Sequence, residues 1–127
     1  MKNDHKGCFV NFSNHPLENW TDAQKNAAAA LAEGPLTDLP FPQVSADADE
    51  AAVAELAEQY AAEIIAMHPA AVMCMGEFGV CFQVVYLLKQ YGIQCVYSCA
   101  ERQVTEMKTP DGTCKHVCFL FRRFRCY

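Results

Sequence analysis

Residues 70–98 read AAVMCMGEFGVCFQVVYLLKQYGIQCVYS, and this stretch decides the fold. Residues 70–75 are apolar at every position, which is typical of a strand buried on both faces of a sheet. A turn at residues 76–79 is followed by a very apolar run that stops at Gly92 and predicts a helix. Residues 93–98 then predict another buried strand. A strand, a helix and a strand in this order indicate a parallel pair joined by a right-handed crossover.

The chain before this unit adds a strand, a helix and a second strand. Residues 8–12 are β-prone and break into a polar turn at residues 13–16. Thr21 and Gln24 have the spacing of a capping box, and the alanine-rich stretch after them stops at Gly34, which predicts a helix over residues 22–33. Residues 36–42 contain two prolines, so we expect only a short strand near an edge of the sheet.

A second helix is predicted ahead of residue 69. Asp47 and Glu50 can cap its start. Apolar residues then recur at steps of three and four, the period of one helical face: Val53, Leu56, Tyr60, Ile64 and Met67.

The last part of the chain has a different pattern. Residues 104–108 and 115–121 flank Thr109-Pro110-Asp111-Gly112, a strong turn signal, so we expect an antiparallel hairpin. The whole pattern predicts an α/β fold with a mainly parallel central sheet and a C-terminal antiparallel hairpin. We expect a single domain over residues 1–127, because the sequence contains no internal repeat and no low-complexity linker.

The composition fits one ordinary globular domain. Of 127 residues, 52% are apolar and 20% are charged, which excludes a disordered chain and two full domains. No apolar run approaches the ~20 residues that cross a bilayer, so we expect no membrane partner. Residues 1–6 do not resemble a signal peptide. We therefore expect a cytoplasmic protein whose eight cysteines are thiols, packed mostly as small apolar side chains.

Charge is divided unevenly along the chain. Residues 101–127 carry six cations and three acids, whereas the rest of the chain carries four cations and twelve acids. An acidic body with a basic edge favours one localised anionic ligand over a long nucleic acid.

Three strand ends carry candidate site residues. In an open parallel sheet, ligands bind outside the carboxyl ends of the strands, where loops and helix N-termini meet. The polar ends are Ser13-Asn14-His15, Gly76-Glu77 and the stretch from Ser98 to Arg102. Imidazole ionises near neutral pH, so His15 suits acid–base work unless it is merely an exposed loop residue.

Two of these residues have a structural alternative. Glu77 can orient a hydroxyl or a cation, or it can place a favourable charge in the first turn of a helix. Arg102 can hold a phosphate with its planar guanidinium, or it can pair with Glu101 or Glu106.

Two groups of residues near the C-terminus also have to be considered as binding sites. Cys114, His116 and Cys118 are too collinear on one strand to hold tetrahedral zinc without a distant fourth ligand, so we expect no metal and no cofactor. The basic residues 122–125 surround Phe124, which suits phosphate pairing and base stacking or simply a solvated end.

Taken in order, the motifs resemble small stand-alone CRISPR-associated proteins proposed as ring nucleases. Residues 11–17, Asn-Phe-Ser-Asn-His-Pro-Leu, with Thr21 and Gln24 downstream, are similar to their opening motif. Residues 76–79 are similar to their central glycine-acid-phenylalanine-glycine turn. Residues 96–102, then Glu106, Gly112 and residues 124–127, resemble their C-terminal motif.

The resemblance implies a Rossmann-like, three-layer fold related to CARF domains. It also implies a homodimer that cleaves cyclic oligoadenylate, with cyclic tetraadenylate as the expected ring, the second messenger of type III CRISPR immunity. A ribose 2′-hydroxyl would attack the neighbouring phosphodiester without metal, so the protein supplies geometry and charge stabilisation. Carried over by position, the catalytic residues are Ser13, His15, Glu77 and Arg102. The ligand-binding residues are Asn14, Gly76, Phe78, Gly79, Ser98, Cys99, Glu106 and Arg125.

Other functions stay open on the sequence. A binding module of the same fold could sense or sequester the messenger without cutting it, although a sensor normally has an attached effector, for which we expect no room in 127 residues. A thiol or metal protein is a second alternative, but the sequence lacks a Cys-x-x-Cys pair. A small α/β interaction protein is the third.

Overall fold

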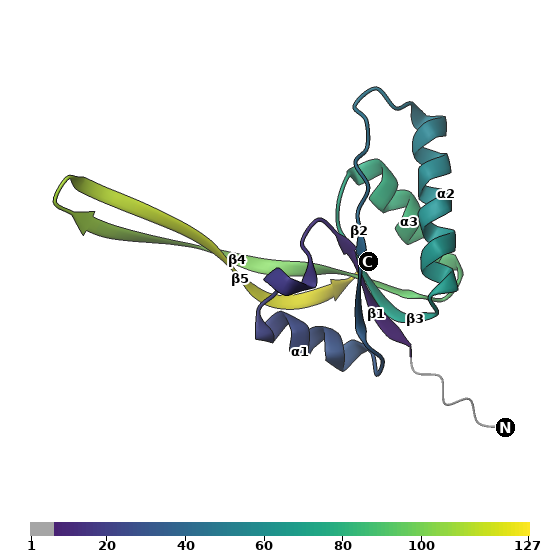
Figure 1. Ribbon diagram of the computed structural model, residues 1–127, viewed down its shortest axis with the longest axis horizontal. Helices are drawn as coiled ribbons and strands as arrows, with labels where there is room; N and C mark the ends of the chain where they lie inside the picture. The colour runs from purple at the N-terminus through teal and green to yellow at the C-terminus, as the bar shows by residue number, and fades with distance from the viewer. Residues whose placement is uncertain (1–6) are drawn as a thin grey trace.

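The computed structural model describes residues 7–127, which form a five-stranded sheet with helices on both faces (Figure 1). Residues 1–6, on which the expectation of no signal peptide rests, lie outside the described residues. The strands are β1 (Cys8–Ser13), β2 (Leu36–Pro40), β3 (Pro69–Cys74), β4 (Gln94–Thr109) and β5 (Gly112–Cys126). The helices are α1 (Asp22–Leu31), α2 (Glu50–Ala66) and α3 (Phe78–Gln90), and a short 3₁₀ helix, η1 (Leu17–Asn19), precedes α1.

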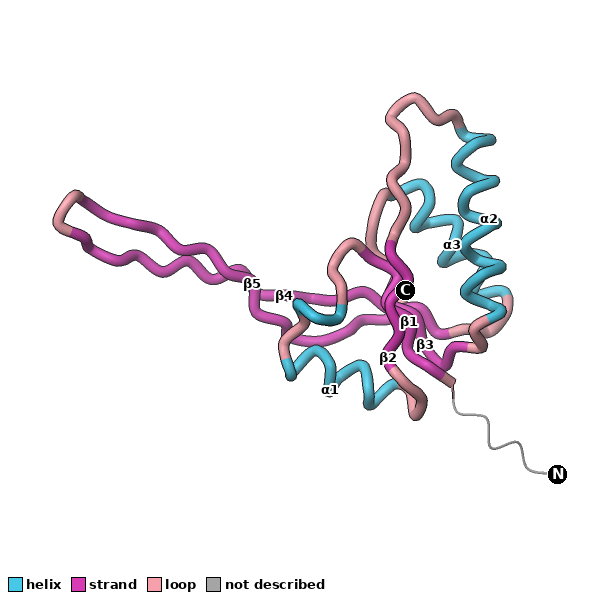
Figure 2. Tube along the Cα trace, in the orientation of Figure 1, coloured by secondary structure: helices cyan, strands magenta, loops and turns pink. Residues whose placement is uncertain are grey.

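The strand order in the sheet is β2-β1-β3-β4-β5. Neighbouring strands are parallel except for β4 and β5, which form the antiparallel pair. The four parallel strands have the order found in flavodoxin-like doubly wound sheets. Helices α2 and α3 cover one face and α1 covers the other (Figure 2). The predicted α/β fold, with its parallel sheet and C-terminal hairpin, is therefore confirmed and is of the Rossmann-like kind.

Each face of the sheet has its own apolar core. Successive side chains of β1 point to opposite faces, so Val10 packs under α2 and α3 while Phe9 packs under α1. Residues 71–74 of β3 are at most 1% exposed, as predicted for a strand covered on both faces. Among residues 7–127, no helix is both long and apolar enough to cross a membrane.

Helix α1 begins where the sequence predicted and ends slightly early. The Thr21 hydroxyl accepts the Gln24 backbone N–H at 3.3 Å, which is the expected cap. The Gln24 side chain reaches the Met73 sulfur at 3.9 Å, so only half of the predicted capping box forms. The helix ends at Leu31, two residues before the predicted end.

Helix α2 starts from a different acid than predicted. Asp49 caps it by accepting the Ala52 N–H at 2.8 Å. Asp47 lies in the turn before the helix, where its own N–H donates to the Ser45 hydroxyl at 3.1 Å. The prediction of an Asp47 cap is therefore wrong.

Strand β4 is much longer than predicted. The sequence suggested a strand at residues 93–98 and a separate hairpin strand at 104–108, but one strand runs from Gln94 to Thr109. Its residues contain no glycine or proline, so the pairing with β5 continues. Beyond a register irregularity at Cys99, the two strands form a ribbon (residues 100–121, the arm) that projects far from the helices and the other strands (Figures 1 and 2). Every residue from 100 to 120 is exposed.

Candidate functional site

The carboxyl ends of β1 and β3 meet β4 at one edge of the sheet. In the strand register, Phe12 of β1 lies beside Cys74 of β3. The Met75 N–H donates to the Phe12 carbonyl at 3.1 Å. Ser98 of β4 donates both its N–H and its hydroxyl to the Met75 sulfur, each at 3.3 Å. This carboxyl edge therefore brings the ends of β1 and β3 beside Ser98, the first residue of the predicted third strand end; β4 itself continues past the edge to Thr109.

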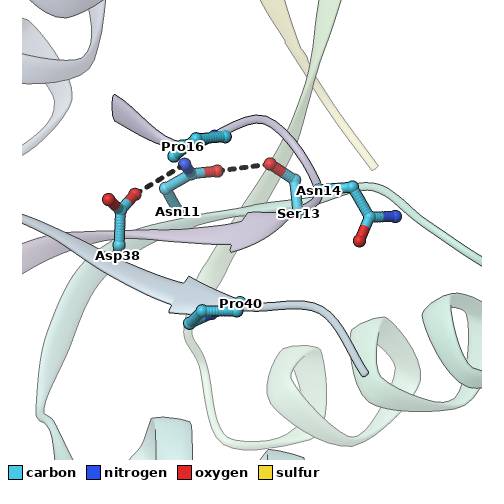
Figure 3. Close-up of a pocket in the computed structure, with 6 residues that line it drawn as sticks. All are labelled: Asn11, Ser13, Asn14, Pro16, Asp38 and Pro40. Carbon is cyan, nitrogen blue, oxygen red and sulfur yellow. Dashed lines mark hydrogen bonds between the residues drawn. The ribbon is translucent and has the colours of Figure 1, made fainter. Parts of the chain in front are cut away.

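A buried polar network fixes the loop after β1 (Figure 3). Ser13, which is 4% exposed, donates its hydroxyl to Asn11 Oδ1 at 2.6 Å. The Asn11 amide donates to Asp38 Oδ1 at 2.9 Å and to the His15 carbonyl at 2.7 Å. The Trp20 ring N–H donates to the same carbonyl at 2.9 Å. Because buried polar groups are costly when unpaired, these bonds fix the path of residues 13–20.

A pocket of about 220 Å³ opens beside this network, between the carboxyl ends of β1 and β2. It is lined by Asn11, Ser13, Asn14, Pro16, Asp38 and Pro40 (Figure 3). Two of these, Ser13 and Asn14, are predicted site residues. Asp38 is the one charged residue of this lining, and it also accepts the Leu17 N–H at 3.1 Å. The pocket therefore offers hydrogen-bonding groups and a carboxylate.

A larger groove, of about 460 Å³, lies at the opposite end of α2 and α3. Its lining includes Ala61, Ile65, Leu87 and Tyr91 and none of the predicted site residues. We therefore place the candidate site at the smaller, polar pocket.

His15 contributes its backbone to the loop. Its N–H contacts the Ser13 hydroxyl oxygen at 3.2 Å, and its carbonyl accepts the bonds described above. Its side chain is exposed and is not part of the pocket lining. The catalytic role of the imidazole stays a prediction, and the structural role of the carbonyl is one that sequence reasoning missed.

Packing and capping explain the turn at residues 76–79. A Cβ atom at Gly76 would lie 2.6 Å from three atoms of the Phe41 ring, so the close approach of the ring requires glycine. Glu77 caps α3, with Oε1 accepting the Val80 N–H at 2.8 Å. The structural role differs from the one that the sequence allowed, because Glu77 is the N-cap that precedes Phe78 and does not lie in the first turn of α3. Phe78 is 91% exposed, and Gly79 is partly buried beside the Glu77 carboxylate.

The predicted residues of the C-terminal strands lie in the sheet, at the start of the arm and along the arm. Cys99 is partly buried where the arm begins. Arg102 and Glu106 are exposed on the arm. Arg102 lies four residues beyond Ser98, about 13 Å along an extended strand. Arg125 is exposed on β5 opposite Tyr97. Arg102 and Glu106 therefore lie outside the carboxyl edge.

The ion pairs of the arm differ from the pair that the sequence allowed for Arg102. Glu101 pairs with Arg122 at 3.5 Å, and Glu106 pairs with Lys115 at 3.7 Å. Both acids pair with cations of β5, and within residues 7–127 Arg102 forms no ion pair with either of them. Arg102 is exposed near the base of the arm.

The possible metal ligands of β5 lie on the exposed part of the arm. Cys114, His116 and Cys118 are all exposed. Across residues 7–127, no three side chains of the His, Cys, Asp or Glu type are grouped in a way that could hold a metal ion. All eight cysteines are free thiols.

Sequence reasoning missed a thiol cluster on the α2–α3 face of the sheet. Cys74 and Cys81 are buried, as expected for apolar packing, but their sulfur atoms lie 3.4 Å apart. The pKa of Cys81 is lowered to about 6, because hydrogen bonds to Cys74 and Tyr127 favour the thiolate more than burial disfavours it. The pKa of Cys74 is raised by its hydrogen bond to Cys81 and by burial. The available signal was two cysteines placed on either side of a strand-to-helix turn.

The chain matches a protein-family model over most of its length. The model is described as the Uncharacterized protein MJ1673 family, and it matches residues 7–125. No curated protein and no solved structure matches the chain. The matched range takes in the carboxyl edge, the pocket and the arm. The chain therefore belongs to the Uncharacterized protein MJ1673 family.

Proposed function

We propose that the protein binds cyclic oligoadenylate at the carboxyl edge and cleaves it without a metal ion. The observation that carries the proposal is the meeting of Ser13, Gly76 and Ser98 at one edge, beside a polar pocket. Open parallel sheets bind their ligands at this edge. The choice of ligand is supported by the order of the motifs, which resembles that of the CRISPR-associated ring nucleases.

The reaction uses a nucleophile that belongs to the ligand. A ribose 2′-hydroxyl attacks the adjacent phosphorus, and the 5′-oxygen of the next nucleotide leaves. The products are a 2′,3′-cyclic phosphate and a 5′-hydroxyl. The protein has only to hold the attacking and leaving oxygens in line and to stabilise the charge that develops on the phosphate.

The structure supports separate roles for the pocket and the arm. Ser13 and Asn14 line the pocket, so we assign them to the ribose and phosphate oxygens. The exposed His15 imidazole is assigned to proton transfer. Arg102 is assigned to the stabilisation of charge on a phosphate. This role requires a ligand that extends from Ser98 to Arg102, about 13 Å along the strand. A ring of several nucleotides meets this requirement better than a single nucleotide does.

The proposal includes a homodimer in the cytoplasm. A ring of identical adenylates is symmetric, so two copies of the chain related by a two-fold axis present the same edge to opposite phosphates. Native mass spectrometry with and without ligand gives the number of chains and of rings in the complex.

The test is a turnover assay with labelled cyclic tri-, tetra- and hexaadenylate in EDTA, with products identified by mass. We expect linear products that end in a 2′,3′-cyclic phosphate, formed fastest from cyclic tetraadenylate. Arg102→Ala should slow cleavage at least tenfold. Lys108→Ala removes an exposed cation nearer the tip of the arm and serves as the matched control. Rings that stay intact after hours with the native protein count against cleavage.

Binding without cleavage is the second candidate. It is favoured by the pocket lining, in which Asp38 is the charged residue and the hydroxyl of Ser13 is already bonded to Asn11. Such a site can recognise a ligand without stabilising extra phosphate charge. The same assay distinguishes the two, because a sensor retains the ring intact and bound.

A further inference from the structure

Two cysteines are in contact beneath the turn that joins β3 to α3. Cys74 is the last residue of β3, and Cys81 lies in the first turn of α3. Their sulfur atoms are 3.4 Å apart, and the Cys81 thiol lies equally close, at 3.4 Å, to the Cys74 carbonyl oxygen. A disulfide requires a further approach of about 1.4 Å between the sulfur atoms.

The last residue of the chain covers this pair. The Tyr127 hydroxyl donates to the Cys74 carbonyl at 2.6 Å and lies 3.5 Å from the Cys81 sulfur. Tyr127 is 42% exposed, so its ring connects the buried thiols with the surface. Its position is fixed by its own N–H, which donates to the Cys95 carbonyl at 3.0 Å, and by Lys89, whose Nζ donates to its carbonyl at 2.9 Å.

The two thiols are chemically unequal. Cys81 has the lowered pKa and is 8% exposed, whereas Cys74 has the raised pKa and is fully buried. The start of a helix also favours an anion at Cys81. The thiolate is the species that reacts with oxidants, so Cys81 is suited to react first and Cys74 to react second.

We propose that Cys81 and Cys74 form a reversible oxidation site for hydroperoxides. The Cys81 sulfur attacks a peroxide oxygen, the O–O bond breaks, and Cys81 becomes a sulfenic acid as hydroxide or alkoxide leaves and takes up a proton. The Cys74 sulfur then attacks the Cys81 sulfur. The S–S bond forms, the S–O bond breaks, and the hydroxyl leaves with the Cys74 proton as water. Two thiols are oxidised, and with hydrogen peroxide two waters are produced.

The disulfide would change a defined part of the molecule. It ties the end of β3 to the first turn of α3 and closes the loop at residues 75–80. In this loop Gly76 lies against the Phe41 ring, whereas Phe78 is 91% exposed. In a reducing compartment such a bond is transient and is reversed by thiols. The proposal rests on the geometry of the thiols and does not depend on the proposed cyclic ligand.

The experiment uses the full-length protein, with hydrogen peroxide as the oxidant. After an acid quench, the protein is unfolded with N-ethylmaleimide, digested with trypsin without reduction and analysed by mass spectrometry. Residues 26–89 form one tryptic peptide that contains Cys74 and Cys81 and no other cysteine. After oxidation we expect this peptide to carry no N-ethylmaleimide label and to have a mass two hydrogens below that of the unlabelled peptide with both thiols free. Dithiothreitol added before the quench should restore both labels.

The sequence also provides an internal control and two informative variants. Residues 7–25 form a tryptic peptide with Cys8 alone, a partly buried thiol on the same sheet that should keep its label. In Cys74→Ser, Cys81 should stop at the sulfenic acid and be trapped by dimedone. In Cys81→Ser, Cys74 should stay labelled. If the native 26–89 peptide keeps both labels while the exposed arm cysteines are oxidised, the proposal is wrong. Oxidation of Cys81 to a sulfinic acid without the disulfide also refutes it.

Discussion

Gly76→Ala should destabilise the protein through one contact. The added Cβ would lie 2.6 Å from three atoms of the Phe41 ring, which is 6% exposed and packs on the Phe12 ring at a centroid distance of 4.6 Å. The ring has little space in which to move, so this is overpacking of a filled core. Such changes cost about 1–3 kcal/mol, and we expect a loss of about 2 kcal/mol in the free energy of unfolding.

A double-mutant cycle tests this explanation. Urea unfolding is followed by the fluorescence of Trp20, the single tryptophan, which is 7% exposed. Phe41→Ala alone should cost about 3–5 kcal/mol because it leaves a cavity. In that background Gly76→Ala should cost less than about 0.5 kcal/mol, since the ring it meets is gone. The reasoning is refuted if Gly76→Ala costs the same in both backgrounds.

Gly79→Ala is the matched control for this cycle. Its Cβ would meet a Val53 methyl carbon at 3.2 Å, a contact that a small shift relieves. Alanine is also a better helix former than glycine by up to about 1 kcal/mol. This variant should therefore be close to neutral, and a loss as large as that of Gly76→Ala would mean that the turn resists any side chain.

Four further predictions follow from the network, the arm and the buried thiols. Asn11→Ala should lower the free energy of unfolding by about 1–3 kcal/mol in urea titration, because it leaves buried polar partners unpaired; a loss under about 0.5 kcal/mol would contradict the network. Arg102→Ala should reduce ligand affinity in calorimetry yet leave the urea midpoint unchanged, since Arg102 is exposed; a large loss of stability would contradict its assignment to the ligand. Replacing residues 103–118 with an Asn-Gly turn should change the free energy of unfolding by less than about 1 kcal/mol, because all the deleted side chains are exposed. Burial raises the pKa of Cys95 to about 11, so the folded thiol stays neutral while the unfolded one ionises near 9.0. Between pH 9.0 and about pH 11, the free energy of unfolding of the native protein should therefore fall more steeply with pH than that of Cys95→Ala. Parallel plots of this free energy against pH for the two proteins would disprove the prediction.

The periodic and local signals of the sequence predicted the fold well. Residues 70–75 were apolar at every position, and residues 71–74 are buried in β3; Gly92, with a φ of 79°, follows the end of α3 as expected. The two prolines after Leu36 correctly predicted a short strand at an edge. These outcomes depend on residues close together in the chain, where backbone preferences and burial decide the structure.

The wrong predictions concerned the start of α2 and the length of β4, where neighbouring residues of similar type do not mark the boundary of the element. Asp47 and Asp49 are equally good helix caps, and the turn at Ser45 decides between them. From the sequence, β4 was predicted as two strands, at residues 93–98 and 104–108. The residues between them carry no apolar pattern that would have marked where the sheet ends and the arm begins. The absence of glycine and proline between Gly92 and Pro110 was the one signal for a continuous strand.

The candidate site was harder to predict because its contacts join distant residues. Asn11 was predicted only as part of a β-prone run and of the opening motif, and its partner Asp38 lies 27 residues away. Gly76 was predicted to bind the ligand, and the structural need for glycine beside the Phe41 ring was missed. Parallel topology alone predicts which strand ends meet at the edge. It does not predict which side chains form hydrogen bonds there.

The two outer boundaries of the sheet differ in how they meet other chains. At one boundary β2 is short and ends in Pro40, with Pro42 soon after, so few backbone groups are free to accept a neighbour. At the other, β5 runs for 15 residues, and the outer part of β4 is also paired on one side only. Unsatisfied N–H and C=O groups along such a ribbon can be extended by an additional strand. Strand addition to this protein, whether productive or as the first step of aggregation, is therefore directed to the arm.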